Sequence, residues 1–183
     1  TLFRSSLSSL HTTHYLLPTS YSPMIDWSNQ RVTVTGATGF IGSVFIEALL
    51  KRGAHVKAPI RSRNFRSLST LRSQVEWLEG DLRDSEYCKQ LIMGSNFIVH
   101  LASHRRTTEF HKDHCADVLL GNLEMSTALA QACKDYPHAK VVFLSTANVP
   151  PELDVVRVSQ QDSLDGFVLG KALSEALWFA TSK

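Results

Sequence analysis

Three glycines near the start of the chain have a spacing that suits the binding of a phosphate-containing ligand. Gly36, Gly39 and Gly42 stand three residues apart within the run Arg-Val-Thr-Val-Thr-Gly-Ala-Thr-Gly-Phe-Ile-Gly at 31–42. In such a motif Gly36 permits a tight turn, Gly39 lets the backbone approach a diphosphate, and Gly42 allows a helix to pack closely. The amide groups at the start of that helix favour an anion. The alternative is a glycine turn that binds no ligand.

The elements on either side of these glycines support the motif. The β-branched residues of 32–35 are typical of a buried parallel strand, and apolar residues recur at helical spacing from Ile41 to Lys51. Strand, glycine turn and helix in this order are the context that a dinucleotide fingerprint requires. We expect a doubly wound α/β fold of the Rossmann type, with at least five parallel strands and helices on both faces. Further strands are expected at 55–60, 75–78, 97–103 and 140–145, and a helix at 117–136.

The end of the second expected strand bears on which dinucleotide binds. An NAD site places an acidic residue there, about 20 residues after the glycines, to hold the ribose hydroxyls. This chain has Ile60 followed by Arg61, Ser62 and Arg63. Guanidinium groups bind a 2′-phosphate in a bidentate manner, whereas a carboxylate would repel it. NADP is therefore the favoured cofactor and NAD the alternative. The other interpretation of Arg61, Arg63 and Arg66 is a solvated loop face.

The stretch from Thr35 to Gly42 resembles the extended branch of the short-chain dehydrogenase/reductase superfamily, the NAD(P)-dependent epimerase/dehydratase family. The resemblance covers the chain from about Arg31 to its C-terminus. It implies redox chemistry on a nucleotide sugar, in the form of epimerisation, 4,6-dehydration or ketone reduction. The cofactor-binding residues expected from the resemblance and from the arginines are Gly36, Thr38, Gly39, Phe40, Ile41, Gly42, Arg61, Arg63, Asp81, Leu82, Leu101, Ala102, Ser103, Asn122 and Lys171.

The resemblance also assigns roles to single residues. Asp81 borders the adenine and accepts a hydrogen bond from its amine, although it could equally cap the helix that begins near Ser85. His100 is a packed histidine next to the cofactor rather than a catalyst. Asn122, in the middle of a helix, bonds the backbone and helps to set the geometry of the site.

Three residues occupy the positions of the family's catalytic groups. Thr146 falls on the catalytic Ser/Thr position, with Ser145 as a substitute and a strand-end cap as the alternative role. The segment from Phe167 to Lys171 resembles the Tyr-x-x-x-Lys helix, in which positions four apart share a face. Lys171 would bond the ribose hydroxyls and lower the pKa of the Tyr. Phe167 stands where that Tyr would be, and it has no proton to give.

Two functions follow from these residues. The first is an NAD(P)-dependent oxidoreductase, epimerase or dehydratase that acts on a nucleotide sugar. The alternative is a catalytically weak NADP-binding module that serves as a sensor or scaffold, favoured by Phe167 and by the missing C-terminal portion that builds the sugar pocket in extended members. We expect a Rossmann domain at 29–183, preceded at 1–28 by a Ser/Thr-rich leader that is disordered or non-native.

Composition narrows the range of partners. The net charge of +2 among 183 residues gives no argument for nucleic acid. No apolar run reaches the ~18 to 20 residues that span a bilayer. The cysteines Cys88, Cys115 and Cys133 are odd in number and widely spaced, which favours reduced thiols and a cytoplasmic location. A homodimer is left open.

A group of histidines invites a metal-site interpretation. His104, His111 and His114 lie close to Cys115 in the sequence. However, these four residues include no His-x-x-x-His or Cys-x-x-Cys pair, and metal chemistry is foreign to the family that the chain resembles. We therefore expect no metal, and a polar loop near the mouth of the substrate site.

Overall fold

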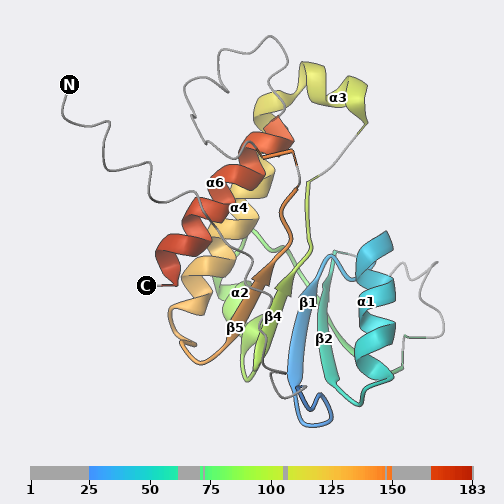
Figure 1. The fold of residues 1–183 in the computed structure, drawn as a ribbon. Coiled ribbons are helices and arrows are strands. Elements are labelled where there is room, and N and C mark those ends of the chain that lie inside the picture. The colour runs from blue at the N-terminus through green and yellow to red at the C-terminus, as the bar shows by residue number, and fades with distance from the viewer. Residues whose placement is uncertain are drawn as a thin grey trace, which may run out of the picture.

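The chain folds around one parallel sheet in the computed structural model, shown in Figure 1. The structure describes residues 25–61, 71, 73–104, 107–146, 148–149 and 166–182. In chain order the elements are β1 (Arg31–Thr35), α1 (Phe40–Leu50), β2 (His55–Ile60), β3 (Val75–Glu79), α2 (Ser85–Ile92), β4 (Phe97–His100), α3 (Thr108–Asp113), α4 (Cys115–Cys133), β5 (Lys140–Phe143) and α6 (Gly166–Thr181).

The five strands lie in the order β3-β2-β1-β4-β5, and every neighbouring pair is parallel. In the central strand β1, Val32 pairs with Val56 of β2 on one side and with Phe97 of β4 on the other. The chain winds from β1 outward to β3 and then returns to β4, so its direction of winding reverses between β1 and β4. Ligands of doubly wound sheets bind beyond the carboxyl ends of the strands at such a reversal.

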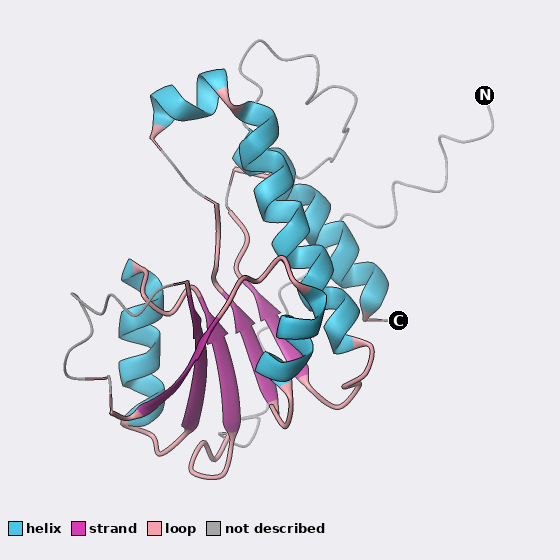
Figure 2. Ribbon diagram, turned by 180° about the vertical axis from the view of Figure 1, so that it is seen from behind, coloured by secondary structure: helices cyan, strands magenta, loops and turns pink. Residues whose placement is uncertain are grey.

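Helices cover both faces of the sheet, as Figures 1 and 2 show. On one face α1 contributes Ile46 to a core that includes Val34 of β1. On the other face α2 and α4 contribute Leu91 and Leu129 to a second core, against which Trp178 of α6 packs. A strand covered on both sides is buried along its length, which explains why the β-branched residues of β1 are almost fully inaccessible. The expected doubly wound fold is confirmed.

Two differences from the expected elements have local causes. The strands β4 and β5 end at His100 and Phe143, earlier than expected. Beyond β4, His104 N donates to Asn122 of α4, and beyond β5, Leu144 O accepts from Lys171 of α6. The polar loop expected between the clustered histidines was wrong in part, because Thr108–Asp113 forms the short helix α3. The hydroxyl of Thr107 caps this helix by accepting a hydrogen bond from Phe110 N at 3.3 Å.

The start of the described chain already contacts the core. Residues 1–24 of the expected leader lie outside the described residues. Trp27, which follows them, packs its ring against Phe97 with 5.1 Å between the centroids. The backbone N–H of Gln30 donates to Trp27 O at 3.0 Å and closes the turn that leads into β1.

Candidate functional site

Glycine is required at position 36 by the turn that leaves β1. Gly36 has a φ of 70°, in the left-handed region that other residues rarely adopt. A Cβ there would lie 2.7 Å from Ala102 N and 2.8 Å from Leu101 C. The segment after β4 therefore runs directly against the turn after β1. We call these two segments, 36–42 and 101–103, the switch-point site.

Helix α1 begins on this turn with its amide groups uncovered. A Cβ added to Gly42 would overlap Gly36 O, so the first helical turn packs on the glycine turn. Gly39 is the N-cap residue, without a side chain to accept hydrogen bonds, and the first turn contains no acidic residue. The helix dipole and the free N–H groups favour an anion here, and the site therefore fits a diphosphate. The exposed residues of this segment are Thr38, Gly39, Phe40 and Ile41.

Asn122 of α4 fixes the course of the chain after β4. Its Oδ1 accepts hydrogen bonds from Ser103 Oγ at 3.1 Å and from His104 N at 2.9 Å. Its Nδ2 donates to His104 O at 3.1 Å and to Val118 O at 2.7 Å. The backbone bonding expected of Asn122 is thus present, and it holds the segment 101–103 against the glycine turn.

The ends of β2 and β3 carry the residues expected near the adenosine. Arg61 is exposed directly after β2, and Arg63 lies outside the described residues. Asp81, after β3, accepts from Arg83 Nε at 3.1 Å and 3.0 Å. The Arg83 guanidinium holds the pKa of Asp81 below its usual value, and the charge of Arg61 acts in the same direction. Leu82 buries its side chain in the core beneath α2, and its carbonyl oxygen accepts from the buried Cys88 Sγ at 3.3 Å.

The alternative role of Asp81 as a helix cap was wrong. The residue that caps α2 is Asp84, whose Oδ1 accepts from Glu86 N at 2.9 Å and from Tyr87 N at 3.2 Å. Asp81 lies three residues earlier and binds Arg83 instead, so its carboxylate stays near the carboxyl end of β3.

Phe167 and Lys171 share one face of α6, next to the end of β5. Lys171 is only 3% exposed, and its Nζ donates to Leu144 O at 2.7 Å. The same Nζ lies 4.6 Å from the ring centroid of Phe143 and 5.8 Å from that of Phe167. Burial lowers the pKa of Lys171 to about 8, against the opposing effect of the Glu175 charge. An ammonium group has three N–H donors, so two remain for ligand hydroxyls.

The two hydroxyls that follow β5 differ in their bonding. Thr146 Oγ1 accepts a hydrogen bond from Asn148 N at 3.4 Å, which is the strand-end capping geometry. It keeps its own hydrogen to donate elsewhere. Ser145 Oγ is buried and has no hydrogen-bond partner within the described part of the chain. A buried polar atom without a partner is rare, and it marks this strand end as a place where a ligand or water can be accommodated.

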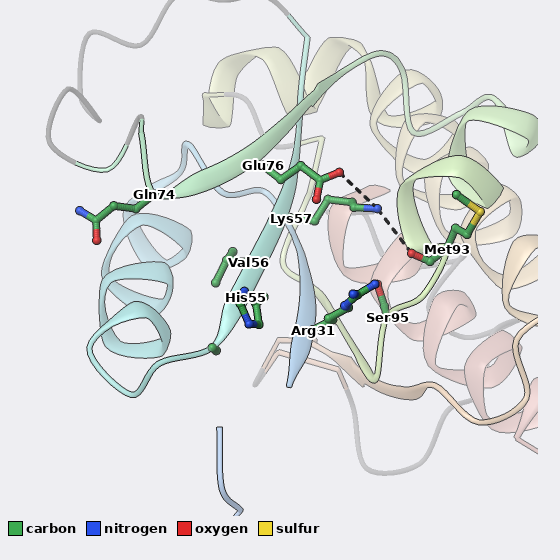
Figure 3. Close-up of a pocket in the computed structure, with 9 residues that line it drawn as sticks. Arg31, His55, Val56, Lys57, Gln74, Glu76, Met93 and Ser95 are labelled. Carbon is green, nitrogen blue, oxygen red and sulfur yellow. Dashed lines mark hydrogen bonds and ion pairs between the residues drawn. The ribbon is translucent and has the colours of Figure 1, made fainter. Parts of the chain in front are cut away.

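A cavity of about 350 Å³ lies elsewhere, at the amino ends of the strands (Figure 3). Across it, Lys57 Nζ bridges to Glu76 at 3.5 Å and donates to Met93 O at 3.4 Å. Because the cavity opens at the opposite end of the sheet from the glycine turn, it is not the switch-point site. Its lining residues are Arg31, Ala54, His55, Val56, Lys57, Gln74, Glu76, Met93 and Ser95.

The described part of the chain has neither a metal-binding cluster nor a membrane-spanning helix. Among them, no group of three or more His, Cys, Asp or Glu side chains is arranged to hold a metal ion. None of the helices described here has the length and apolar character needed to cross a membrane.

Sequence reasoning missed a set of buried polar residues behind the site. Thr35, Ser126 and Ser174 are each at most 2% exposed. His100 bonds both Thr35 and Ser126, and Ser126 also bonds Ser174. The signal that would have found the serines is helical spacing from residues already singled out. Ser126 follows Asn122 by four positions, and Ser174 lies three positions after Lys171.

Comparison with known proteins agrees with this geometry. The chain matches the NAD dependent epimerase/dehydratase family over residues 32–167. It is 30% identical, over 165 residues, to dTDP-4-dehydro-6-deoxy-D-allose reductase of Streptomyces bikiniensis. That alignment covers 82% of this chain and 51% of the reductase, so the chain spans about half the length of this relative.

Solved structures match the chain over a similar extent. The UDP-glucose 4-epimerase of Thermus thermophilus in complex with NAD is 25% identical, with a TM-score of 0.65. The match covers 82% of this chain and 50% of the epimerase. The Bordetella bronchiseptica enzyme WbmH in complex with NAD+ is 24% identical, with a TM-score of 0.66 over 83% of this chain and 53% of that one. From the family match, the chain belongs to the NAD dependent epimerase/dehydratase family.

Proposed function

We propose that this chain is the cofactor-binding part of an NADP(H)-dependent enzyme that acts on a nucleotide sugar. The observation that carries the proposal is the uncovered amino end of α1 at the switch-point site. Backbone amides there provide the diphosphate site, and family membership supports the dinucleotide. The named relatives support the sugar, since one is a dTDP-sugar reductase and another a UDP-glucose 4-epimerase.

The preference for NADP over NAD rests on the end of β2. Ile60 stands where an NAD site has an acid, and Arg61 beside it is exposed. Ile60 pairs with Glu79, the last residue of β3, so Arg61 follows β2 beside the end of β3. A 2′-phosphate gains from that charge, whereas the ribose hydroxyls of NAD lack a carboxylate partner.

Each residue of the catalytic set has one role in this proposal. A bound NADP(H) supplies the hydride that redox chemistry at a sugar carbon requires. Lys171, held against Leu144 O, presents its two remaining N–H donors to the nicotinamide ribose. Thr146 donates its hydroxyl hydrogen to the reacting oxygen of the sugar. Phe167 occupies the place of the general acid/base and can neither give nor accept a proton.

Phe167 also favours a second candidate function, a catalytically weak NADP-binding sensor or scaffold. Its ring centroid lies 5.8 Å from Lys171 Nζ, and the family resemblance assigns a catalytic tyrosine to this position. Without that hydroxyl, dinucleotide binding is retained while proton transfer is lost. The buried and positively charged Lys171 favours the enzyme, because a module that only binds has little need of it.

Binding and turnover experiments separate the two candidates. Calorimetric titration with NADP+ and NAD+ should show binding, tighter for NADP+. Turnover of a dTDP-4-keto-6-deoxy sugar with NADPH should be slow, and Phe167→Tyr should raise it by ~10²- to 10⁴-fold in the full-length protein. Phe167→Leu is the matched control and should not raise it. Ordinary turnover without the tyrosine would mean that another residue supplies the proton.

The proposal extends to location and assembly. We place the protein in the cytoplasm, where the cysteines Cys88, Cys115 and Cys133, which form no disulfide with one another, stay reduced. Its partner is a nucleotide sugar rather than nucleic acid or a membrane. Whether the protein is a homodimer is decided by light scattering at micromolar concentration.

A further inference from the structure

A row of buried polar side chains crosses the core behind the switch-point site. Ser174 Oγ of α6 donates to Ser126 Oγ of α4 at 2.9 Å. Ser126 Oγ lies 3.4 Å from His100 Nε2, and His100 Nδ1 lies 2.7 Å from Thr35 Oγ1. Thr35 Oγ1 also accepts from Ala102 N at 3.1 Å. We call these four side chains, Thr35, His100, Ser126 and Ser174, the polar row.

The hydrogen bonds of the polar row accommodate the tautomer of His100 that has its hydrogen on Nε2. Thr35 Oγ1 accepts from the backbone N–H of Ala102, and its own hydrogen is available for the short contact with His100 Nδ1, which then accepts and carries no hydrogen. In this arrangement Nε2 donates to Ser126 Oγ, whose two lone pairs accept from this N–H and from Ser174 Oγ.

The surroundings of His100 keep the imidazole neutral. His100 is 1% exposed and packs against the rings of Phe143 and Trp178, with centroids 5.6 Å and 6.2 Å away. Burial, and after it the positive charge of Lys171, lower the pKa of His100 to about 3. At pH 7 the imidazole is therefore neutral, with one nitrogen that donates a hydrogen bond and one that accepts.

The two ends of the polar row lie next to the two parts of the protein that bind the cofactor in the proposed function, the glycine turn and Lys171. Thr35 directly precedes Gly36, and it also holds the N–H of Ala102 on the other side of the switch-point site. Ser174 lies one helical turn beyond Lys171. The row thus connects the diphosphate-binding turn with the helix that carries the lysine.

We propose that His100 is a positioning residue, held as the neutral Nε2–H tautomer, which fixes the glycine turn and helix α6 relative to one another. The inference rests on the proposed function, since it concerns how the two halves of one dinucleotide site are kept in register. An apolar core would pack equally well but would leave α6 free to shift along the sheet. Directional hydrogen bonds define a single arrangement.

The tautomer is tested directly by nitrogen NMR of the protein labelled with ¹⁵N-histidine. We expect the His100 Nδ1 signal in the range of an unprotonated nitrogen that accepts a hydrogen bond, and the Nε2 signal in the protonated range. His100→Gln identifies the signals. A protonated Nδ1, or a doubly protonated ring at pH 7, would overturn the inference, whatever the protein binds.

Positioning is tested by two matched substitutions in β1. Thr35→Val removes a hydroxyl of the polar row, and we expect it to weaken NADP+ binding by about tenfold, the value of one hydrogen bond. Thr33→Val is the control, because Thr33 is equally buried and its hydroxyl bonds Ser95 Oγ at 2.7 Å and Leu91 O at 3.3 Å, away from the site. Thr35→Ser keeps the hydroxyl and should bind NADP+ normally.

A substitution at the far end separates positioning from general stability. Ser126→Ala breaks the row between His100 and α6, while the glycine turn keeps its contacts. We expect weaker binding of NADP+ by about threefold to tenfold and unchanged binding of 2′,5′-ADP, which lacks the nicotinamide half. Equal losses for both ligands, or equal effects of Thr35→Val and Thr33→Val on NADP+ affinity, would overturn the inference. If the unsubstituted protein binds no dinucleotide, the proposed function fails, and the NMR result still decides the tautomer.

Discussion

Two helices of this protein begin at the same edge of the sheet, but a side chain caps the first amide groups of only one of them. Helix α2 starts after β3 with Asp84, whose carboxylate accepts from two of those amides. Its first turn also contains Glu86, which complements the helix dipole. Helix α1 starts after β1 with Gly39, without a cap or an acidic residue. One end is satisfied by its own chain, and the other is left for a ligand.

The difference suggests a criterion for a binding site: a helix end that binds a ligand lacks the side-chain cap that stabilises an ordinary helix end. A side-chain cap contributes about 1 kcal/mol to the stability of a helix, and α1 gives up that contribution. The uncovered end coincides with the reversal of winding between β1 and β4, where doubly wound sheets bind ligands. Lys171, buried near the same edge, is a second group whose environment is unfavourable without a ligand.

The largest effect is expected when helix α1 is given an aspartate N-cap like that of α2. Gly39→Asp should lower NADP+ affinity by at least about 100-fold, because the carboxylate occupies the amides and repels the diphosphate. The free energy of unfolding should not fall, since the φ of −79° at this position suits a capping residue. Calorimetry and urea unfolding measure the two effects.

Two neutral substitutions separate the charge from the added atoms. Gly39→Ala adds only a Cβ, which would lie 3.1 Å from Gly36 O. Gly39→Asn adds a cap of the same shape without the charge. We expect affinity to decrease from Ala to Asn to Asp. Normal NADP+ binding by the Asp variant would mean that the diphosphate does not lie at this helix end.

The cost of Lys171 should appear in the pH dependence of stability. In the unfolded chain a lysine keeps its proton up to about pH 10.5, whereas folded Lys171 has a pKa of about 8. Between these values the unfolded state binds more protons, so the free energy of unfolding rises with pH. The penalty is constant below pH 8 and is relieved by about 1 to 3 kcal/mol toward pH 10.5.

Lys171→Met provides the reference for this measurement. Burial raises the pKa values of Cys88 and of the partly buried Tyr87 to about 12, and the contribution of these two groups to stability falls as the pH rises through this range. The difference in unfolding free energy between the unsubstituted protein and the Met variant isolates the lysine. A difference that is flat between pH 8 and 10.5 would contradict a buried, charged Lys171.

Local patterns in the sequence were enough to predict the fold and the position of the switch-point site. The glycine spacing and the strand before it predict a tight turn at Gly36, and the structure confirms the turn with a φ of 70° at this residue. The backbone bonding of Asn122 was expected from the family resemblance. These features depend on residues close together in sequence, or on a motif.

Features that depend on contacts across the fold were not predictable in this way. Asp81 and Asp84 are both suited to cap a helix, and only the geometry shows that Asp81 pairs with Arg83. The polar row joins four elements, and its members are 26 to 65 residues apart where they touch. Helical spacing points to the two serines, but a single sequence carries no signal for which residues of different elements pair with them.

A smaller effect is expected at the end of β2. Arg61→Ala should lower the ratio of NADP+ to NAD+ affinity by about tenfold, the value of one charge-assisted interaction with the 2′-phosphate. Arg52→Ala is the matched control, because Arg52 is an exposed arginine that follows the carboxyl end of α1, away from the site. Its Nη1 donates to Ala48 O at 3.0 Å. An unchanged ratio in the Arg61 variant would remove Arg61 from the site and leave the glycine turn unaffected.

The smallest effect is expected where the comparison predicts no binding role at all. Asp84→Ala removes the cap of α2, which leaves Glu86 N and Tyr87 N without their acceptor and should lower the free energy of unfolding by about 1 kcal/mol. Asp84→Asn keeps an acceptor at the same place and should recover most of that loss. NADP+ affinity should stay the same in both variants, because a helix end satisfied by its own side chain offers no amides to a phosphate. If affinity fell with the loss of this cap, the corner between β3 and α2 would belong to the binding site, and the distinction between the two helix ends would not hold.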